Sequence, residues 1–350
     1  MTKKFKKAFI LSGGGTRSAI YLGMFSALEE LGMAPDLLLA SCGGAFAATI
    51  INAFPDHSSR KEYLKSEEYF EFVINTRLTN DTRLHKIGML TLQKLLNNRN
   101  APFIEDIFNR YLVEMKQDIT EDFPSLKTQF SKEIPTIIIG SEVLFAPEEV
   151  GQIRNNRKLY RKIILTDPET AKIIDPEKIT VNSDNFKNSA IETYPEIKTD
   201  FSMLQSTRIS VSDMFYVQPF LSEGKYYAGG AIDLIPAEIA KHLADEIIIE
   251  KKQSYNPVEE SFVRSVLGYS GNKRLKEVEN QKPDFEIETA DIKNALDGHY
   301  IKKSIDWRRF GIAFSFPKTR SEFAANMELQ WQYGFSQTMK SFNESRGNKS

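Results

Sequence analysis

Cysteine is almost absent from this sequence, with Cys42 the single one among 350 residues. One cysteine cannot form an intramolecular disulfide, so a disulfide-stapled secreted scaffold is excluded. Histidine is scarce too, and the four that occur show no metal-ligand spacing: His57, His85, His242 and His299. We therefore expect no metal site and no cofactor.

Excess charge and long apolar runs are also lacking. A formal net charge of −1 gives no bulk electrostatic signal for nucleic-acid binding. No apolar run approaches the roughly 20 residues of a membrane-spanning helix, and the N-terminus lacks the features of a secretory signal. We expect a cytoplasmic protein. The basic residues Lys3, Lys4, Lys6 and Lys7 leave peripheral contact with an anionic membrane open, although they fit a solvated lead-in to the first strand better.

The apolar residues that are present predict an α/β fold. Residues 8–11 and 36–41 have the pattern of short buried strands, and residues 16–32 and 45–54 have helical spacing. This alternation favours a mainly parallel sheet with helices on both faces. Further strands are predicted at 134–143, 161–166, 224–228, 244–251 and 309–317, with a helix from 236 and a closing helix over 321–344.

We predict one domain spanning residues 1–350, because no linker or internal repeat divides the chain. Its core would comprise residues 5–54 and 134–250. Residues 55–132 would form a helical insertion, in which 66–78, 87–99 and 101–117 are amphipathic. A C-terminal cap would cover residues 251–350, and within it 253–305 has the composition of a loose, charged segment.

Three glycine-bearing turns follow predicted strands, at residues 13–15, 43–44 and 229–230. The carboxyl ends of parallel strands share one edge of a sheet, so we expect these turns to converge. Glycines between a strand and a helix let backbone N–H groups point at a phosphate or an oxyanion. A dinucleotide site fits poorly, because the second strand ends in Ser41-Cys42 rather than in an acidic residue.

Residues 40–44, Ala-Ser-Cys-Gly-Gly, have the outline of a nucleophile turn between a strand and a helix. Such a turn holds its central side chain exposed in front of a helix N-terminus. The glycine loop at 13–15, together with the Gly43 amide, could then supply the N–H donors for a tetrahedral oxyanion. This pairing favours acyl transfer through Cys42.

Taken together, these motifs resemble the patatin-like phospholipase family over about residues 5–54 and 134–250. Segments 11–32, 36–50, 206–220 and 226–251 are similar to its segments in order and spacing. The resemblance implies a three-layer fold and a lipid acyl hydrolase with a serine–aspartate pair and no histidine. It also places Gly13, Gly14, Gly15 and Arg17 in the oxyanion loop. Arg17 would orient that loop or meet a substrate phosphate.

Three positions depart from the family pattern. Cys42 stands where the resemblance implies serine, Ala228 where it implies aspartate, and Ser18 where glycine is common. A cysteine, with an ordinary pKa of about 8.5, is already a few per cent thiolate at neutral pH, so its attack can proceed without a base. A helix N-terminus lowers that pKa, and the loss of a carboxylate at position 228 would favour the thiolate too. Water, however, needs activation to release the acyl group.

We therefore expect slow deacylation, or transfer to a nucleophile better than water. Three interpretations of the pair stay open: a natural reactive cysteine, an engineered alanine that stalls an active enzyme, or two decayed positions. Substitutes for the missing base are few. Asp233 fits better as the N-cap of the helix from Pro236, and Glu142 as a solvated charge at a strand end.

The sequence thus favours an acyl hydrolase or acyltransferase that uses Cys42 on a lipid ester or an acyl thioester, with an acyl carrier as a further partner. The alternative is a non-catalytic patatin-like scaffold that binds lipid or a protein. A nucleotide-binding protein that uses the first glycine loop ranks third.

Overall fold

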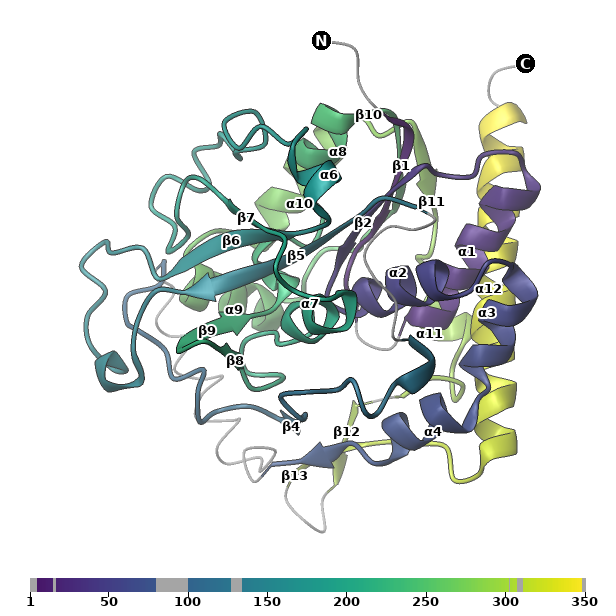
Figure 1. Cartoon of the computed structure of the whole chain (residues 1–350), viewed down its shortest axis with the longest axis horizontal. Helices are drawn as coiled ribbons and strands as arrows, with labels where there is room; N and C mark the ends of the chain where they lie inside the picture. The colour runs from purple at the N-terminus through teal and green to yellow at the C-terminus, as the bar shows by residue number, and fades with distance from the viewer. Residues whose placement is uncertain are drawn as a thin grey trace.

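The computed structural model describes residues 5–14, 17–79, 100–126, 134–301, 303–306 and 311–347 (Figure 1). The strands are β1 Phe5–Leu11, β2 Leu37–Ser41, β3 Arg77–Leu78, β4 Val113–Glu114, β5 Thr136–Val143, β6 Tyr160–Leu165 and β7 Glu196–Lys198. They continue with β8 Phe220–Ser222, β9 Lys225–Ala228, β10 Ala244–Glu250, β11 Phe285–Ile287, β12 Lys303–Asp306 and β13 Gly311–Phe314.

Helices alternate with these strands along the chain. They are α1 Ser18–Glu30, α2 Gly43–Ala53, α3 His57–Leu64, α4 Glu67–Ile74, α6 Pro168–Ala171 and α7 Met203–Ser210. The remainder are α8 Ala237–Leu243, α9 Pro257–Leu267, α10 Gly271–Asn280, α11 Ile292–Ala295 and α12 Arg320–Gly347. In the described ranges, no helix is both long enough and apolar enough to cross a membrane.

One nine-stranded sheet forms the centre of the described chain, in the order β11-β10-β1-β2-β5-β6-β7 with β9 and β8 attached through β5. The five strands from β11 to β5 are parallel, whereas β6 runs antiparallel to β5. The predicted α/β fold with a mainly parallel sheet is therefore confirmed.

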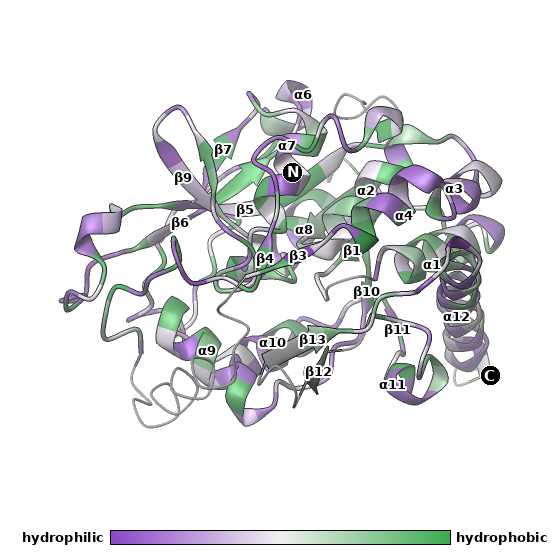
Figure 2. Cartoon of the chain, turned by 90° about the horizontal axis from the view of Figure 1, so that it is seen from below, coloured by the Kyte–Doolittle hydropathy of each residue, from purple (hydrophilic) through white to green (hydrophobic). Residues whose placement is uncertain are grey.

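Helices cover both faces of this sheet because the strands are apolar on both sides. Along β1, Phe9 and Leu11 belong to one buried cluster, with α1, α2 and α12. The alternate residues Ala8 and Ile10 belong to a second cluster, with α8 and α10. Figure 2 shows the green of hydrophobic residues along α2, while purple dominates the outer helix α12. Side chains alternate across a strand, so each face acquires its own core and the fold has three layers.

Strand β9 reaches the edge of the sheet where β2 ends, in a direction that the sequence did not indicate. It pairs antiparallel with β5 through Ser141 and Ala228, just beyond the point where β2 ends opposite Ile139. Because β6 occupies the other edge of β5, β9 lies in line with β2 and runs towards it. The glycine turn after β9 therefore meets the end of β2 head-on. Convergence of the glycine turns was predicted, but the reason given for this one was wrong.

In its described residues, 55–79 and 100–126, the insertion is less helical than predicted. Residues 57–74 form α3 and α4, but 101–117 is irregular apart from the two residues of β4, and 87–99 lies outside the described residues. Two buried arginines fix the irregular chain. Arg154 donates to the carbonyls of residues 100 and 101, and Arg208 donates to those of residues 115 and 116. These contacts satisfy backbone groups that a helix would have bonded internally.

The segment 253–305 is more regular than predicted. It contains α9 and α10, and β11 extends the central sheet beside β10. The Asn256 side chain caps the N-terminus of α9 in a capping box with Glu259, and Gly268 ends the helix in the left-handed conformation. Such caps satisfy the free groups of helix ends and fix where the helix begins and stops.

Candidate active site

Cys42 stands at the turn between β2 and α2 with a backbone that non-glycine residues rarely adopt, at φ 50° and ψ −126°. A backbone of this kind costs of order 1–3 kcal/mol and persists only where its surroundings enforce it. In this structure, a hydrogen bond from the backbone amide of Cys42 holds this conformation. The Cys42 N–H donates to Ser210 Oγ at 2.8 Å, and that hydroxyl donates to the Ile139 carbonyl at 2.6 Å. The thiol is consequently left partly exposed in front of α2.

The first glycine turn packs directly against this cysteine. A Cβ atom built on Gly13 would lie 2.7 Å from Cys42 Cβ, so only glycine leaves room for the two backbones at this distance. The end of β1, just before the loop, also meets α2 at Gly44, whose added Cβ would lie 1.8 Å from the Leu11 carbonyl oxygen. Gly15 lies outside the described residues. The described part of the loop is thus held beside Cys42.

An alanine at position 44 should destabilise the protein by about 2–3 kcal/mol, because its methyl group would overlap backbone rather than a movable side chain. Urea unfolding of Gly44→Ala measures this loss. Gly347→Ala is the control, since nothing lies within 4 Å of a Cβ at that position. Equal midpoints for the two variants would contradict the close packing of the end of β1 on α2.

Asp213 is the functional candidate that sequence reasoning missed. It lies between α7 and β8, in the segment 206–220 that resembles the family. The Cys42 thiol donates a hydrogen bond to its carboxylate. Its Oδ1 also accepts the N–H of Ala231 at 2.9 Å. Burial raises the pKa of Asp213, and these two hydrogen bonds oppose that rise. The thiol is therefore not without a carboxylate, contrary to the prediction.

Ala228 contributes no polar group to the site. It is fully buried at the end of β9, opposite Ser141, and belongs to the apolar cluster on the α8 side of the sheet. The two glycines after it do reach the site. A Cβ on Gly229 would lie 2.1 Å from Asp213 Oδ1, and one on Gly230 would lie 3.0 Å from the Cys42 nitrogen. The glycine turn thus packs against both Asp213 and Cys42.

A buried ion cluster supports the loop from below. Glu250, at the end of β10, is fully buried and accepts hydrogen bonds from Arg17, from Lys252 at 2.6 Å and from Tyr21 at 2.7 Å. Lys252 in turn donates to the Gly13 carbonyl at 2.9 Å. The cluster therefore ties β10 to the glycine loop, and these contacts suit Arg17 as a residue that orients the loop.

Charges in this cluster are strongly perturbed. Burial alone would raise the pKa of Glu250, but the charges of Lys252 and Arg17 outweigh it and lower that pKa to about 2. Burial lowers the pKa of Lys252 to about 8, against the opposing attraction of Glu250. Lys252 also interacts electrostatically with Cys42. A cation near a cysteine favours its thiolate.

The other acidic candidates have structural roles. Asp233 does not cap α8, whose N-cap is Pro236; instead its carboxylate pairs with Lys162 at 3.0 Å and Arg274 at 3.4 Å. Glu142 is buried within β5 and is not a solvated strand end; it pairs with Lys225 at 3.0 Å. Neither prediction for these two residues holds. Among the described residues, no three His, Cys, Asp or Glu side chains are grouped to hold a metal ion.

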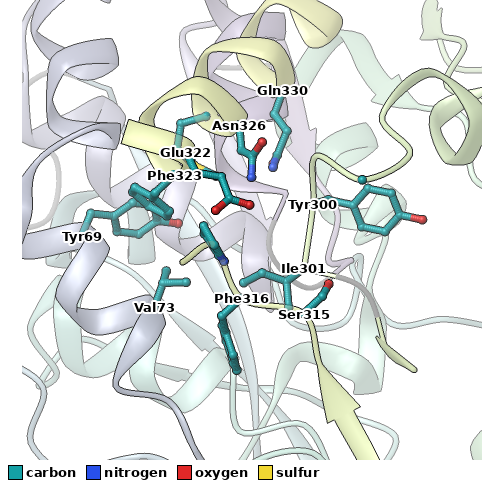
Figure 3. Close-up of a pocket in the computed structure, with 13 residues that line it drawn as sticks. Tyr69, Val73, Tyr300, Ile301, Ser315, Phe316, Glu322, Phe323, Asn326 and Gln330 are labelled. Carbon is teal, nitrogen blue, oxygen red and sulfur yellow. The ribbon is translucent and has the colours of Figure 1, made fainter. Parts of the chain in front are cut away.

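A separate pocket opens between α4, α12 and the chain around residues 298–301 and 315–317 (Figure 3). Aromatic and apolar side chains such as Tyr69, Val73 and Phe323 line it, with Asn326 and Gln330 as polar members. None of Gly13, Cys42 and Asp213 lines it. The sequence did not single out this pocket, and it holds none of the chemistry described above.

The fold and site define an α/β protein in which a glycine loop packs beside the sharp turn between β2 and α2. The patatin-like phospholipase family model matches residues 9–241, so the chain belongs to that family.

Two solved structures are similar in outline. VipD from Legionella pneumophila is 12% identical with a TM-score of 0.35, the match covering 97% of this chain and 67% of VipD. Human GIVD cytosolic phospholipase A2 is 9% identical with a TM-score of 0.35, covering 98% of this chain and 59% of that protein. The sequence matches none of the curated proteins with which it was compared.

Proposed function

We propose that this protein is an acyl hydrolase or acyltransferase in which Cys42 forms a covalent acyl-enzyme with a lipid ester or an acyl thioester. The observation that carries the proposal is the strained backbone of Cys42 at the head of α2, with Gly13 packed against it. A strained turn that exposes one nucleophilic side chain to a glycine loop is the arrangement that acyl transfer requires.

The reaction begins with attack of Cys42 Sγ on the acyl carbonyl carbon. The carbonyl oxygen gains negative charge and is stabilised by backbone N–H groups of residues 13–15 and of Gly43, at the start of α2. The carbon–oxygen or carbon–sulfur bond to the leaving group then breaks and leaves a thioester on Cys42. Arg17 and Lys252 act through Gly13 and Gly14 by fixing the loop, which makes them positioning residues.

A lipid substrate agrees with the family and with the surroundings of the site. Two large side chains on the segment after Asp213, Tyr216 and Leu221, are 47% and 46% exposed. In this proposal, these two side chains contact the lipid surface. Peripheral membrane contact by this segment, and delivery of the acyl group by a carrier, are parts of the proposal.

Alkylation and release assays test the function together. Cys42 should react with one equivalent of iodoacetamide at neutral pH, faster than a free thiol, and acyl substrate should protect it. A panel of acyl thioesters and phospholipid esters should then show continuous release of the acyl group from at least one donor. Slow alkylation with tight lipid binding and no release from any donor would overturn the proposal in favour of a binding scaffold.

A further inference from the structure

We propose that Asp213 is the catalytic base of this site, and that the acid has moved from the strand position held by Ala228 to the segment after α7. This inference rests on the function proposed above. Its basis is that the Asp213 carboxylate accepts the hydrogen bond of the Cys42 thiol. A base must lie within hydrogen-bond reach of the proton it removes, and Asp213 meets that condition.

Several contacts hold this carboxylate in place. The Ala231 N–H donates to Oδ1 at 2.9 Å, and the Gly229 N–H donates to the Ser212 carbonyl at 2.8 Å. The Gly229 backbone lies so close that an added Cβ would be 2.1 Å from Oδ1 and 2.5 Å from the Asp213 nitrogen. The glycine at 229 therefore makes the space that the relocated carboxylate occupies.

The same segment orients the nucleophile. Ser210, three residues before Asp213, accepts the Cys42 N–H at 2.8 Å and is anchored on the Ile139 carbonyl of β5. One short segment, residues 210–213, thus both holds the backbone of Cys42 through Ser210 and supplies its proton acceptor, Asp213. An aspartate at the end of β9 is not needed to complete the pair, and the fully buried Ala228 methyl group packs in the apolar core instead.

The chemistry balances with water or another acceptor as co-reactant. In acylation, Sγ bonds to the carbonyl carbon while Asp213 takes the thiol proton and passes it to the departing alkoxide or thiolate. In deacylation, Asp213 takes a proton from the incoming water or alcohol as its oxygen bonds to the same carbon. The carbon–sulfur bond then breaks, and the proton returns to Sγ. Burial, which raises the pKa of Asp213 above its ordinary value, strengthens the carboxylate as a base.

Time-resolved intact mass after mixing with an acyl thioester tests the inference. The wild-type chain should gain the acyl mass and lose it again. Asp213→Asn should gain it and retain it, with deacylation slowed at least about 100-fold. Glu142→Gln, which alters another buried carboxylate that pairs with Lys225 and Arg161, is the matched control and should deacylate at the wild-type rate.

Other outcomes separate the two proposals. Deacylation of Asp213→Asn at the wild-type rate would overturn the role of Asp213 while leaving the acyl-enzyme intact. Turnover that appears only in Ala228→Asp would place the base at position 228 and would also overturn the role of Asp213. No adduct and no release in the wild-type chain would overturn the proposed function itself. If thermal unfolding shows Asp213→Asn to be misfolded, Asp213→Ser, whose hydroxyl can still accept the Ala231 N–H, replaces it.

Discussion

Cys42→Ala is expected to abolish acyl-enzyme formation and to lower turnover at least about 10³-fold, because no other group can take the place of the attacking sulfur. The fold should survive. Cys42 is partly exposed, and alanine removes only one sulfur atom, so we expect a change in unfolding free energy within about 1 kcal/mol. Steady-state release of the acyl group and urea unfolding, measured on the same preparation, separate the two effects.

Cys42→Ser is the informative companion. A serine hydroxyl needs a base, and Asp213 stands where it would accept that proton, so this variant should retain more ester hydrolysis than the alanine variant. Alanine and serine variants that release acyl groups as fast as the wild-type chain would exclude Cys42 as the nucleophile.

Glu250→Gln should destabilise the protein by about 3–5 kcal/mol, because it leaves the charges of Arg17 and Lys252 without their buried counter-charge. It should also slow acylation, since Lys252 holds the Gly13 carbonyl through the same cluster. Urea unfolding gives the first effect and the rate of adduct formation gives the second. Glu246→Gln, on the same strand, is the control: its pair with Lys7 is exposed and 3.7 Å long, so its loss should cost less than about 1 kcal/mol.

The cluster of Glu250, Arg17 and Lys252 also determines how the unfolding free energies of the wild-type chain and of Glu250→Gln depend on pH. The pKa of Glu250 is about 2 in the folded state, below its ordinary 4.5, so its contribution is complete above pH 4.5 and is lost as the pH falls towards 2. The folded pKa of Lys252 is also lowered, to about 8, so burying this amine costs stability below pH 8 and less as the pH rises to 10.5. The deficit of Glu250→Gln should therefore be larger at pH 7 than at pH 10. A deficit independent of pH would contradict the burial of Lys252 as a cation.

Local signals predicted the core of the fold. The strands and helices of residues 8–54 were predicted from the spacing of apolar residues, which is a local property of the sequence. The sole cysteine stands at the turn between β2 and α2. The sequence analysis did not predict helices α9 and α10. The signals for the ends of α9 are nevertheless present in the sequence: Asn256, Pro257 and Glu259 at its start and Gly268 at its end. The many charged residues of segment 253–305 favoured a loose segment in the sequence analysis, and the capping residues were not considered.

Long-range contacts account for the other misses. Asp213 becomes part of the site only because β9 runs antiparallel into the end of β2, which sequence patterns do not reveal. The amphipathic stretch 101–117 looked helical, but Arg154 and Arg208, distant along the chain, bind its carbonyls and hold it extended or irregular. The ion cluster around Glu250 depends on the pairing of β1 with β10, which the sequence alone does not reveal.

The most direct test of the account is peptide mapping after an acid quench of the protein mixed with an acyl thioester. Acid stops deacylation, and tandem mass spectrometry then locates the acyl group on the chain. We predict the added acyl mass on Cys42, at a stoichiometry that rises in Asp213→Asn and is absent from Cys42→Ala. An acyl group on any other residue, or none on Cys42 while the protein turns over substrate, would contradict the account.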